Sequence, residues 1–175
     1  MAKEGYYTSP KKETYTYEEL RPMFERCIMD RATYLGFFYK VMPKELFDLY
    51  AKKALWELGR FRHEVRGWSP VKGSIECFGD YLVEGFDVNN TLSDHNEYVE
   101  LTEDHATIHM LGKCALVKGW EEMGFPPEDV AYLCEIACYG DYGHTDACDL
   151  KGTFTFTSAQ PGKDYCEFII EKKAP

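Results

Sequence analysis

The chain lacks any hydrophobic run long enough to cross a membrane. A spanning helix needs roughly 20 consecutive apolar residues, and no stretch of the 175-residue sequence provides them. The first residues, Met1 to Tyr7, also lack the apolar core of a secretion signal. We therefore expect a cytoplasmic protein with no membrane partner, in a compartment where cysteine thiols stay reduced.

Positive charge is scarce as well. The sequence contains 20 Lys and Arg residues and 30 Asp and Glu residues, which gives a formal net charge of −10. Such a surface repels phosphate backbones, and no basic stripe is present, so nucleic acid is excluded as a partner. The glycine-rich patterns of dinucleotide sites and P-loops are also missing. A small molecule remains the expected partner.

The seven cysteines are odd in number and irregularly spaced, so they do not form the pattern of a disulfide framework. Their plainest interpretation is that of buried thiols that act as small hydrophobic residues. Aromatic residues make up 15% of the chain. That content suits a core, and it equally suits a pocket for a flat or apolar molecule.

Helical signals dominate the first half of the chain. Thr16 and Glu19 form a capping box, and apolar residues then recur at helical spacing as far as about Val41. Pro43 suits the first turn of a second helix, so the two helices are expected to form an αα-hairpin. After a break at 67–70, Ser74 caps a third helix, and a second break follows at 89–91.

Strand signals appear in the second half. Alternating residues predict four strands, at 98–101, 105–110, 152–157 and 165–171. Pro161-Gly162 predicts a type II turn between the last two. Between the two hairpins we expect a helix at 115–123 and another from Pro126-Pro127 to about Gly140, followed by a loop rich in Gly, His, Asp and Cys.

This order of elements predicts an α+β fold, with helices packed on an antiparallel sheet of about four strands. We expect a polar tail over residues 1–15 and a single domain over residues 16–175. The sequence leaves the oligomeric state open, a homo-oligomer included.

Reactive side chains concentrate between Cys134 and Cys166. Cys134, Cys138 and Asp141 follow one another at i, i+4 and i+7, which places them on one helix face. Asp141 is expected at the helix end, among glycines that allow close backbone approach. Two thiols and a carboxylate suit a nucleophile or a metal site. The alternative is that both thiols are core residues, because free Cys is among the most buried residue types.

Three further side chains are candidates for catalysis. His144 and Asp146 in the predicted loop could form a general acid/base couple, although a solvated loop histidine is the plainer interpretation. Cys166 alternates with Phe168, so it faces inward, where it either packs or approaches Cys134. We expect Cys134, Asp141 and Cys166 to line one pocket.

Two histidines lie on one predicted strand. His105 and His109 share a face, but they stand about 13 Å apart and cannot bind one metal ion together. His109 is the better single candidate, and a hydrogen-bonded core histidine is the alternative. Arginines near residue 62 are expected at the surface, although an arginine that lines a pocket could hold a carboxylate substrate.

Metal binding is a minor hypothesis. A zinc site could be assembled from Cys134, Cys138, His144 and Cys148, but the spacing C-x3-C-x5-H-x3-C does not match the usual zinc patterns. We therefore expect no cofactor and keep zinc as the alternative.

With these residues in place, the chain resembles the L-2-amino-thiazoline-4-carboxylic acid hydrolase-like family over about Arg21 to Phe168. The resemblance rests on four segments: Phe38-Tyr39-Lys40-Val41 leading into 51–59, then 114–124, Leu133-Cys134-Glu135 with Asp141 downstream, and the closing 162–168. The closing Gly-x-x-x-Cys-x-Phe also resembles the end of 4-vinyl-reductase-like ligand-binding domains, some of which bind zinc through Cys and Glu.

The resemblance implies a cytoplasmic hydrolase that opens a carbon–nitrogen bond of a small cyclic amidine carboxylate by adding water. It implies Cys134 as the first nucleophile and Cys166 as the second, with Asp141 or His144 moving protons. His109 stays a further candidate for catalysis. The alternative function is a non-catalytic small-molecule-binding domain of the 4-vinyl-reductase-like kind, with or without a metal.

Overall fold

The computed structural model describes residues 14–67, 71–84 and 93–173. Most of the expected polar tail, most of the break at 67–70 and the whole break at 89–91 therefore lie outside the described residues. No described helix combines the length and the apolar character that crossing a membrane requires.

The three helices predicted in the first half are confirmed. Helix α1 spans Tyr17–Val41, and its capping box forms, because the Thr16 hydroxyl accepts a hydrogen bond from the Glu19 amide while the Glu19 carboxylate accepts one from the Thr16 amide. Helix α2 spans Lys44–Glu64. Helix α3 spans Ile75–Val83 and is capped by the Ser74 hydroxyl.

The predicted four-stranded antiparallel sheet is also confirmed. Strands β1 (His95–Leu101), β2 (His105–Leu111), β4 (Tyr165–Lys172) and β3 (Leu150–Phe156) lie side by side in that order. Gly162 has a φ of 76°, and the Lys163 amide donates to the Gln160 carbonyl over 3.1 Å. These features agree with the type II turn expected between β3 and β4, which needs a positive φ at its third residue.

The region after Gly140 differs from the prediction. Helix α5 (Ala115–Glu122) and helix α6 (Pro127–Ala137) lie where they were expected, but the chain then forms helix α7 over Tyr139–Ala147 in place of a loop. Gly, Asp and Thr are weak helix formers, so this helix is stabilised by its contacts rather than by its composition. Its main partner is α2.

Two glycines explain how closely α7 approaches α2. A Cβ atom at Gly59 would overlap the Gly140 carbonyl oxygen, and one at Gly143 would overlap the Trp56 carbonyl oxygen. The two helices therefore touch backbone to backbone. Asp141 and His144, which the sequence placed at a helix end and in a loop, lie instead on a helix fixed against α2.

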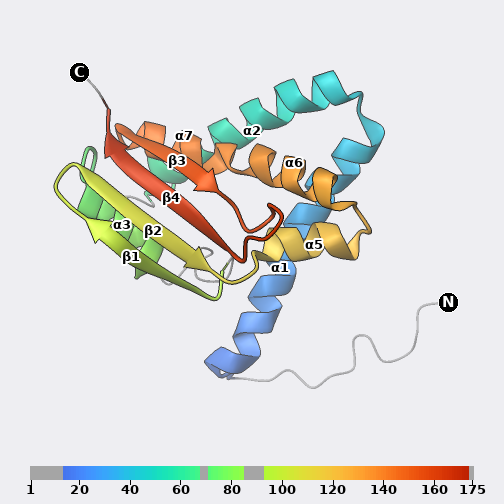
Figure 1. The fold of residues 1–175 in the computed structure, drawn as a ribbon, viewed down its shortest axis with the longest axis horizontal. Helices are drawn as coiled ribbons and strands as arrows, with labels where there is room; N and C mark the ends of the chain where they lie inside the picture. The colour runs from blue at the N-terminus through green and yellow to red at the C-terminus, as the bar shows by residue number, and fades with distance from the viewer. Residues whose placement is uncertain (1–13, 68–70, 85–92, 174–175) are drawn as a thin grey trace.

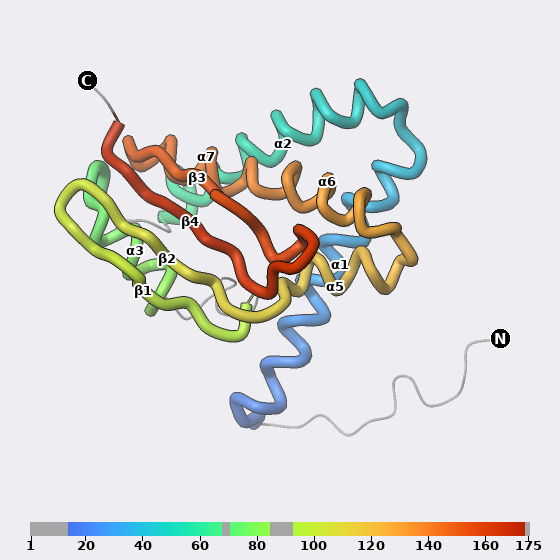
Figure 2. Tube along the Cα trace, in the orientation of Figure 1, coloured from blue at the N-terminus to red at the C-terminus, as the bar shows by residue number. Residues whose placement is uncertain are grey.

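The hydrophobic residues form two clusters. In one, α3 and the start of β3 pack against β2 and β4, with Phe78, Ile108 and Phe168 at its centre. In the other, α1, α2, α5 and α6 surround Phe47 and Trp120, and the Trp120 indole donates to the Ala32 carbonyl. Figures 1 and 2 show α2 running alongside α6 and α7, while α1 passes beside α5 and extends away from the sheet.

Candidate functional site

A cavity of about 530 Å³ lies between α1 and α2. Its volume falls in the range of small-molecule sites, roughly 300–1,000 Å³. Most lining residues are apolar: Ala32, Leu35, Phe38, Met42, Phe47, Ala51, Ala54, Leu55, Leu58, Leu116, Trp120 and Ala137. Tyr34 and Tyr50 line it as well. The small side chains on α2 and α6 leave the space that larger ones would fill.

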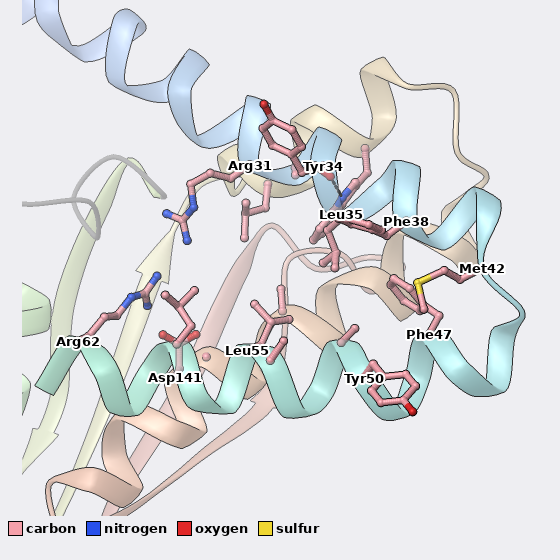
Figure 3. Close-up of a pocket in the computed structure, with 18 residues that line it drawn as sticks. Arg31, Tyr34, Leu35, Phe38, Met42, Phe47, Tyr50, Leu55, Arg62 and Asp141 are labelled. Carbon is pink, nitrogen blue, oxygen red and sulfur yellow. Dashed lines mark hydrogen bonds between the residues drawn. The ribbon is translucent and has the colours of Figure 1, made fainter. Parts of the chain in front are cut away.

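The charged residues of this cavity gather at one end. Arg31 comes from α1, Arg62 from α2 and Asp141 from the first turn of α7. Figure 3 shows the two guanidinium groups pointing toward one another, with the Asp141 carboxylate beside them and with Met42 and Phe47 at the opposite end. The cavity is therefore apolar along its length and charged at one end.

The two arginines repel one another. Desolvation by the surrounding protein lowers the pKa of Arg31 and the Arg62 charge lowers it further, while Asp141 raises it. Arg31 nevertheless remains exposed to solvent. An arginine keeps its proton at any physiological pH. Two positive charges thus face one carboxylate.

Asp141 is held between two opposing effects. Desolvation raises the pKa of the Asp141 carboxyl, and the nearby Arg62 and Arg31 charges offset that rise only in part. The carboxyl therefore takes up a proton at a higher pH than an exposed aspartate does. When it is protonated, it no longer offsets the charges of Arg31 and Arg62.

The two thiols of α6 lie in the protein interior. Cys134 and Cys138 are buried, and neither is among the residues that line the cavity. Hydrogen bonds from Cys138 and Thr157 lower the pKa of Cys134. The pKa of Cys138 is raised, because Cys138 donates a hydrogen bond to Cys134 and is buried. Cys134 is therefore the thiol of the pair that ionises first.

Cys166 faces inward from β4, as its alternation with Phe168 predicts. The Ser158 amide donates a hydrogen bond to its sulfur over 3.2 Å, and desolvation raises the pKa of the thiol. The charges of Cys134 and Asp141 raise it further, so the three groups lie close enough to influence one another's ionisation. Asp141 lines the cavity and the two thiols do not, so the expected shared pocket is not this cavity.

The structure buries His144. Its imidazole packs against the edges of Phe78 and Tyr81, with ring centroids 5.0 and 5.3 Å away. Burial, together with the Arg62 and His63 charges, lowers the pKa of His144 to about 4, so the ring is neutral near pH 7. The expected solvated loop histidine is therefore wrong, because α7 is a helix in which His144 faces the interior.

The other histidine and carboxylate candidates have partners elsewhere. Asp146 accepts hydrogen bonds from Arg60 and Lys173 rather than acting as the partner of His144. His109 Nε2 lies 3.0 Å from the Glu167 carboxylate across the β2–β4 pair. None of these side chains is among the lining residues of the cavity.

Among the described residues, one group of histidine, cysteine and acidic side chains brings three ligand atoms within 4.8 Å of one another: His63, His144 and Cys148. Two members of the zinc alternative are in this group, but Cys134 and Cys138 are not. The third ligand, His63, comes from α2, more than eighty residues earlier in the sequence.

Sequence reasoning missed Arg31 as a site residue. It stands three residues after Ile28 and four before Leu35, both on the inward face of α1. A charged residue within an apolar helix face is a signal that could have found it. Arg62 was expected at the surface, and it lines the cavity because the end of α2 runs beside α7.

No protein-family model matches the chain, and no curated protein matches it. A solved structure of similar fold is the trafficking protein particle complex subunit 3 from Naegleria fowleri, covalently bound to palmitic acid. The TM-score is 0.57, with 11% identity over 88% of this chain and 97% of that chain. At this level of identity, the likeness shows a shared fold alone.

Proposed function

We propose that this chain binds an elongated apolar molecule with an anionic end, such as a fatty-acid-like carboxylate, in the cavity between α1 and α2. The ligand is bound without being transformed. The observation that carries the proposal is an apolar cavity of about 530 Å³ with Arg31 and Arg62 together at one end.

The apolar walls supply most of the binding energy. Each methylene that leaves water contributes about 0.8 kcal/mol, which corresponds to roughly a fourfold gain in affinity. Phe47 and Trp120 line the cavity and are otherwise packed into the core, so these parts of the wall are firmly held. A hydrocarbon chain therefore gains affinity with each carbon until it reaches the end near Met42.

The charged end selects the head group. Guanidinium groups bind carboxylates through two parallel hydrogen bonds, and these charge-assisted bonds are stronger than neutral ones. An anion between Arg31 and Arg62 also removes the repulsion between them. A guanidinium group forms stronger hydrogen bonds with an anion than with a neutral head group, so an anionic head group is favoured.

The solved structure of similar fold agrees with an apolar ligand, because the Naegleria fowleri protein is covalently bound to palmitic acid. In this chain no cysteine is among the described residues that line the cavity. We therefore expect a ligand held by contacts alone. A cytoplasmic location agrees with a role as a carrier or a sensor of such a molecule.

Hydrolysis of a small cyclic amidine carboxylate is the second candidate. Asp141 is the observation that favours it, since a carboxyl with a raised pKa can take and return a proton closer to neutral pH. The arginines would hold the substrate carboxylate. Cys134 is buried away from the cavity, so activated water is the more accessible nucleophile.

Calorimetry with a series of straight-chain carboxylates tests the binding proposal, with the corresponding alcohols as head-group controls. We expect the affinity to rise about fourfold per added carbon and the alcohols to bind more weakly than the acids. Intact mass should not change on incubation. An affinity that does not depend on chain length would contradict the proposal.

The same protein incubated with 2-aminothiazoline-4-carboxylate separates the two candidates. Binding of long-chain carboxylates without turnover supports the carrier or sensor. Turnover that Asp141→Asn abolishes while the thermal unfolding midpoint is retained supports the hydrolase.

A further inference from the structure

A second cluster of polar side chains lies where α2 and α7 meet, next to the cavity but outside its lining. His63 is in the last turn of α2, while His144 and Cys148 stand one turn apart at the end of α7. The Cys148 sulfur lies 3.3 Å from Nδ1 of His63, and ligand atoms of all three side chains lie within 4.8 Å of one another. Figure 1 shows the ends of the two helices beside β3.

One atom of this cluster has no hydrogen-bond partner. Among the described residues, Nε2 of His144 is the one buried side-chain nitrogen or oxygen without one. Leaving such a group unsatisfied costs about 1–3 kcal/mol. The Phe78 and Tyr81 rings contact the imidazole by ring packing, and no hydrogen bond to this nitrogen forms. A ligand that accepts the lone pair of a neutral imidazole would remove this cost.

The spacing is close to that of a tetrahedral metal site. With metal–nitrogen bonds of about 2.0–2.1 Å and metal–sulfur bonds of about 2.3 Å, ligand atoms stand roughly 3.3–3.6 Å apart. The His63–Cys148 distance of 3.3 Å already fits. All three pairs of ligand atoms lie within 4.8 Å of one another, so small side-chain rotations are enough to bring the remaining two pairs to this spacing.

The backbone holds the cysteine in place. The Cys148 amide donates to the carbonyl groups of His144 and Thr145, and its own carbonyl accepts from the Gly73 amide over 2.7 Å. A metal ion binds with a defined coordination geometry, and a ligand that is already held in place favours that geometry. The exposed side of His63 gives an ion a path from solvent.

We propose that His63, His144 and Cys148 bind a divalent transition-metal ion of the zinc class, with the fourth position open. Two imidazoles and one thiolate are soft and intermediate ligands. Such a set binds zinc in preference to magnesium or calcium, which favour oxygen ligands. Three protein ligands and an open fourth position are the arrangement of catalytic zinc sites.

An anion suits the open position. One thiolate leaves a bound divalent ion with a net charge of +1, and Arg62, which directly precedes His63 on α2, adds a further positive charge nearby. Hydroxide or a small carboxylate would balance that charge. The proposal stands apart from the proposed function, because none of the three ligands lines the cavity.

Cobalt(II) titration of the untagged, chelator-treated full chain tests the site. We expect one equivalent to bind, with the visible absorption of four-coordinate cobalt and a near-ultraviolet thiolate-to-cobalt band. Zinc should displace it and raise the unfolding temperature. His63→Ala should weaken binding more than about 100-fold, since even second-shell changes cost 10- to 100-fold. Cys148→Ser should remove the thiolate band.

Matched controls separate this site from the other thiols and histidines. His109→Ala changes a strand histidine outside the cluster, and the double variant Cys134→Ser, Cys138→Ser removes the thiol pair of α6. Both should keep one equivalent of cobalt and its spectrum. Circular dichroism checks that each variant folds, and His63→Ala, at a half-buried position, keeps the test decisive if Cys148→Ser does not fold.

Two outcomes would overturn the proposal. In one, the chain takes up no cobalt at protein-stoichiometric concentrations, and the cluster is then a hydrogen-bonded group of the core. In the other, the cobalt spectrum survives in His63→Ala and is lost in the Cys134 and Cys138 double variant, which would assign the metal to α6.

Discussion

Arg62 and His63 are neighbours in the last turn of α2, yet they belong to two different environments. Arg62 lines a large apolar cavity that opens between α1 and α2, whereas His63 contributes to a small polar cluster where α2 and α7 touch. The difference arises from the residues between the helices. Gly59 and Gly143 let α2 and α7 meet at their backbones, while α1 and α2 leave the apolar cavity between them.

The helix contact is the feature that both environments share, so breaking it should have the largest effect. Gly59→Ala places a Cβ atom against the Gly140 carbonyl, and neither backbone can move away easily. Overpacking of this kind costs about 1–3 kcal/mol or more. We expect the free energy of unfolding to fall by at least about 2 kcal/mol, measured by denaturant unfolding, with loss of both ligand and cobalt binding.

Gly140→Ala is the matched control on the opposite helix. A Cβ atom there would meet its nearest neighbours at 3.7 and 4.0 Å, which is ordinary contact. Alanine also favours the helix by up to about 1 kcal/mol over glycine. We expect unchanged or slightly higher stability. Equal destabilisation by the two changes would show that close packing of α2 on α7 is not what positions the sites.

Filling the cavity should affect ligand binding and leave the metal cluster intact. Ala51 lines the cavity on α2, so Ala51→Trp replaces space for the ligand with an indole. We expect affinity for a long-chain carboxylate to fall more than about tenfold, the loss of a few buried methylenes. Lys53→Trp adds the same bulk on the exposed side of α2 and should change nothing. Calorimetry measures the affinity of both variants for the carboxylate, and equal affinities would show that the ligand binds outside this cavity.

The head-group interaction should have a smaller effect. Arg31→Met keeps an apolar side chain but removes one guanidinium, and hydrogen bonds between charged partners are worth about 1.5–3 kcal/mol. Because solvent reaches this end, we expect about a tenfold loss for carboxylates and none for alcohols. Arg26→Met is the control, because Arg26 is also on α1 but forms an exposed ion pair with Glu122 of α5. A loss shared by acids and alcohols would make Arg31 a packing residue.

The pH dependence should be the smallest effect. Asp141 has a raised pKa and is ionised at high pH, so it offsets one of the two arginine charges. As pH falls through that raised pKa, above the ordinary value of 3.8, the carboxyl is neutralised and the cavity end becomes more positive. The affinity for a dodecyl sulfonate, whose head group stays ionised, should therefore rise by about threefold, as expected for screened unit charges several ångströms apart.

Asp141→Asn should remove most of this pH dependence and bind the sulfonate more tightly at high pH. The other groups that face Asp141 are Arg31 on α1, Arg62 on α2, the thiols of Cys134 and Cys138 on α6 and the thiol of Cys166 on β4. The arginines do not titrate in this range. A pH dependence that survives in Asp141→Asn would assign it to another group.

Local signals in the sequence account for most of the fold. The Thr16–Glu19 capping box, the Ser74 cap and the turn at Gly162 each act within a few residues, so a local pattern predicts them. Helix α7 could not be predicted in this way, because its residues favour turns and it is stabilised by its contacts with α2. Both candidate sites depend on that distant contact.

The candidate site residues divide in the same manner. Asp141 was found because thiols and glycines surround it in the sequence, and the structure places it at the cavity end. Its partners Arg31 and Arg62 come from helices that close on it only in three dimensions. His63 joins His144 and Cys148 for the same reason, and no spacing rule covers ligands separated by eighty residues.

The position of a bound ligand tests the central claim most directly. A crystal structure of the chain with a straight-chain carboxylate that carries bromine on its last carbon would locate both ends, because bromine scatters anomalously. We predict the carboxylate between Arg31 and Arg62 and the bromine near Met42 and Phe47. Bromine beside the arginines, or a ligand outside the space between α1 and α2, would contradict it.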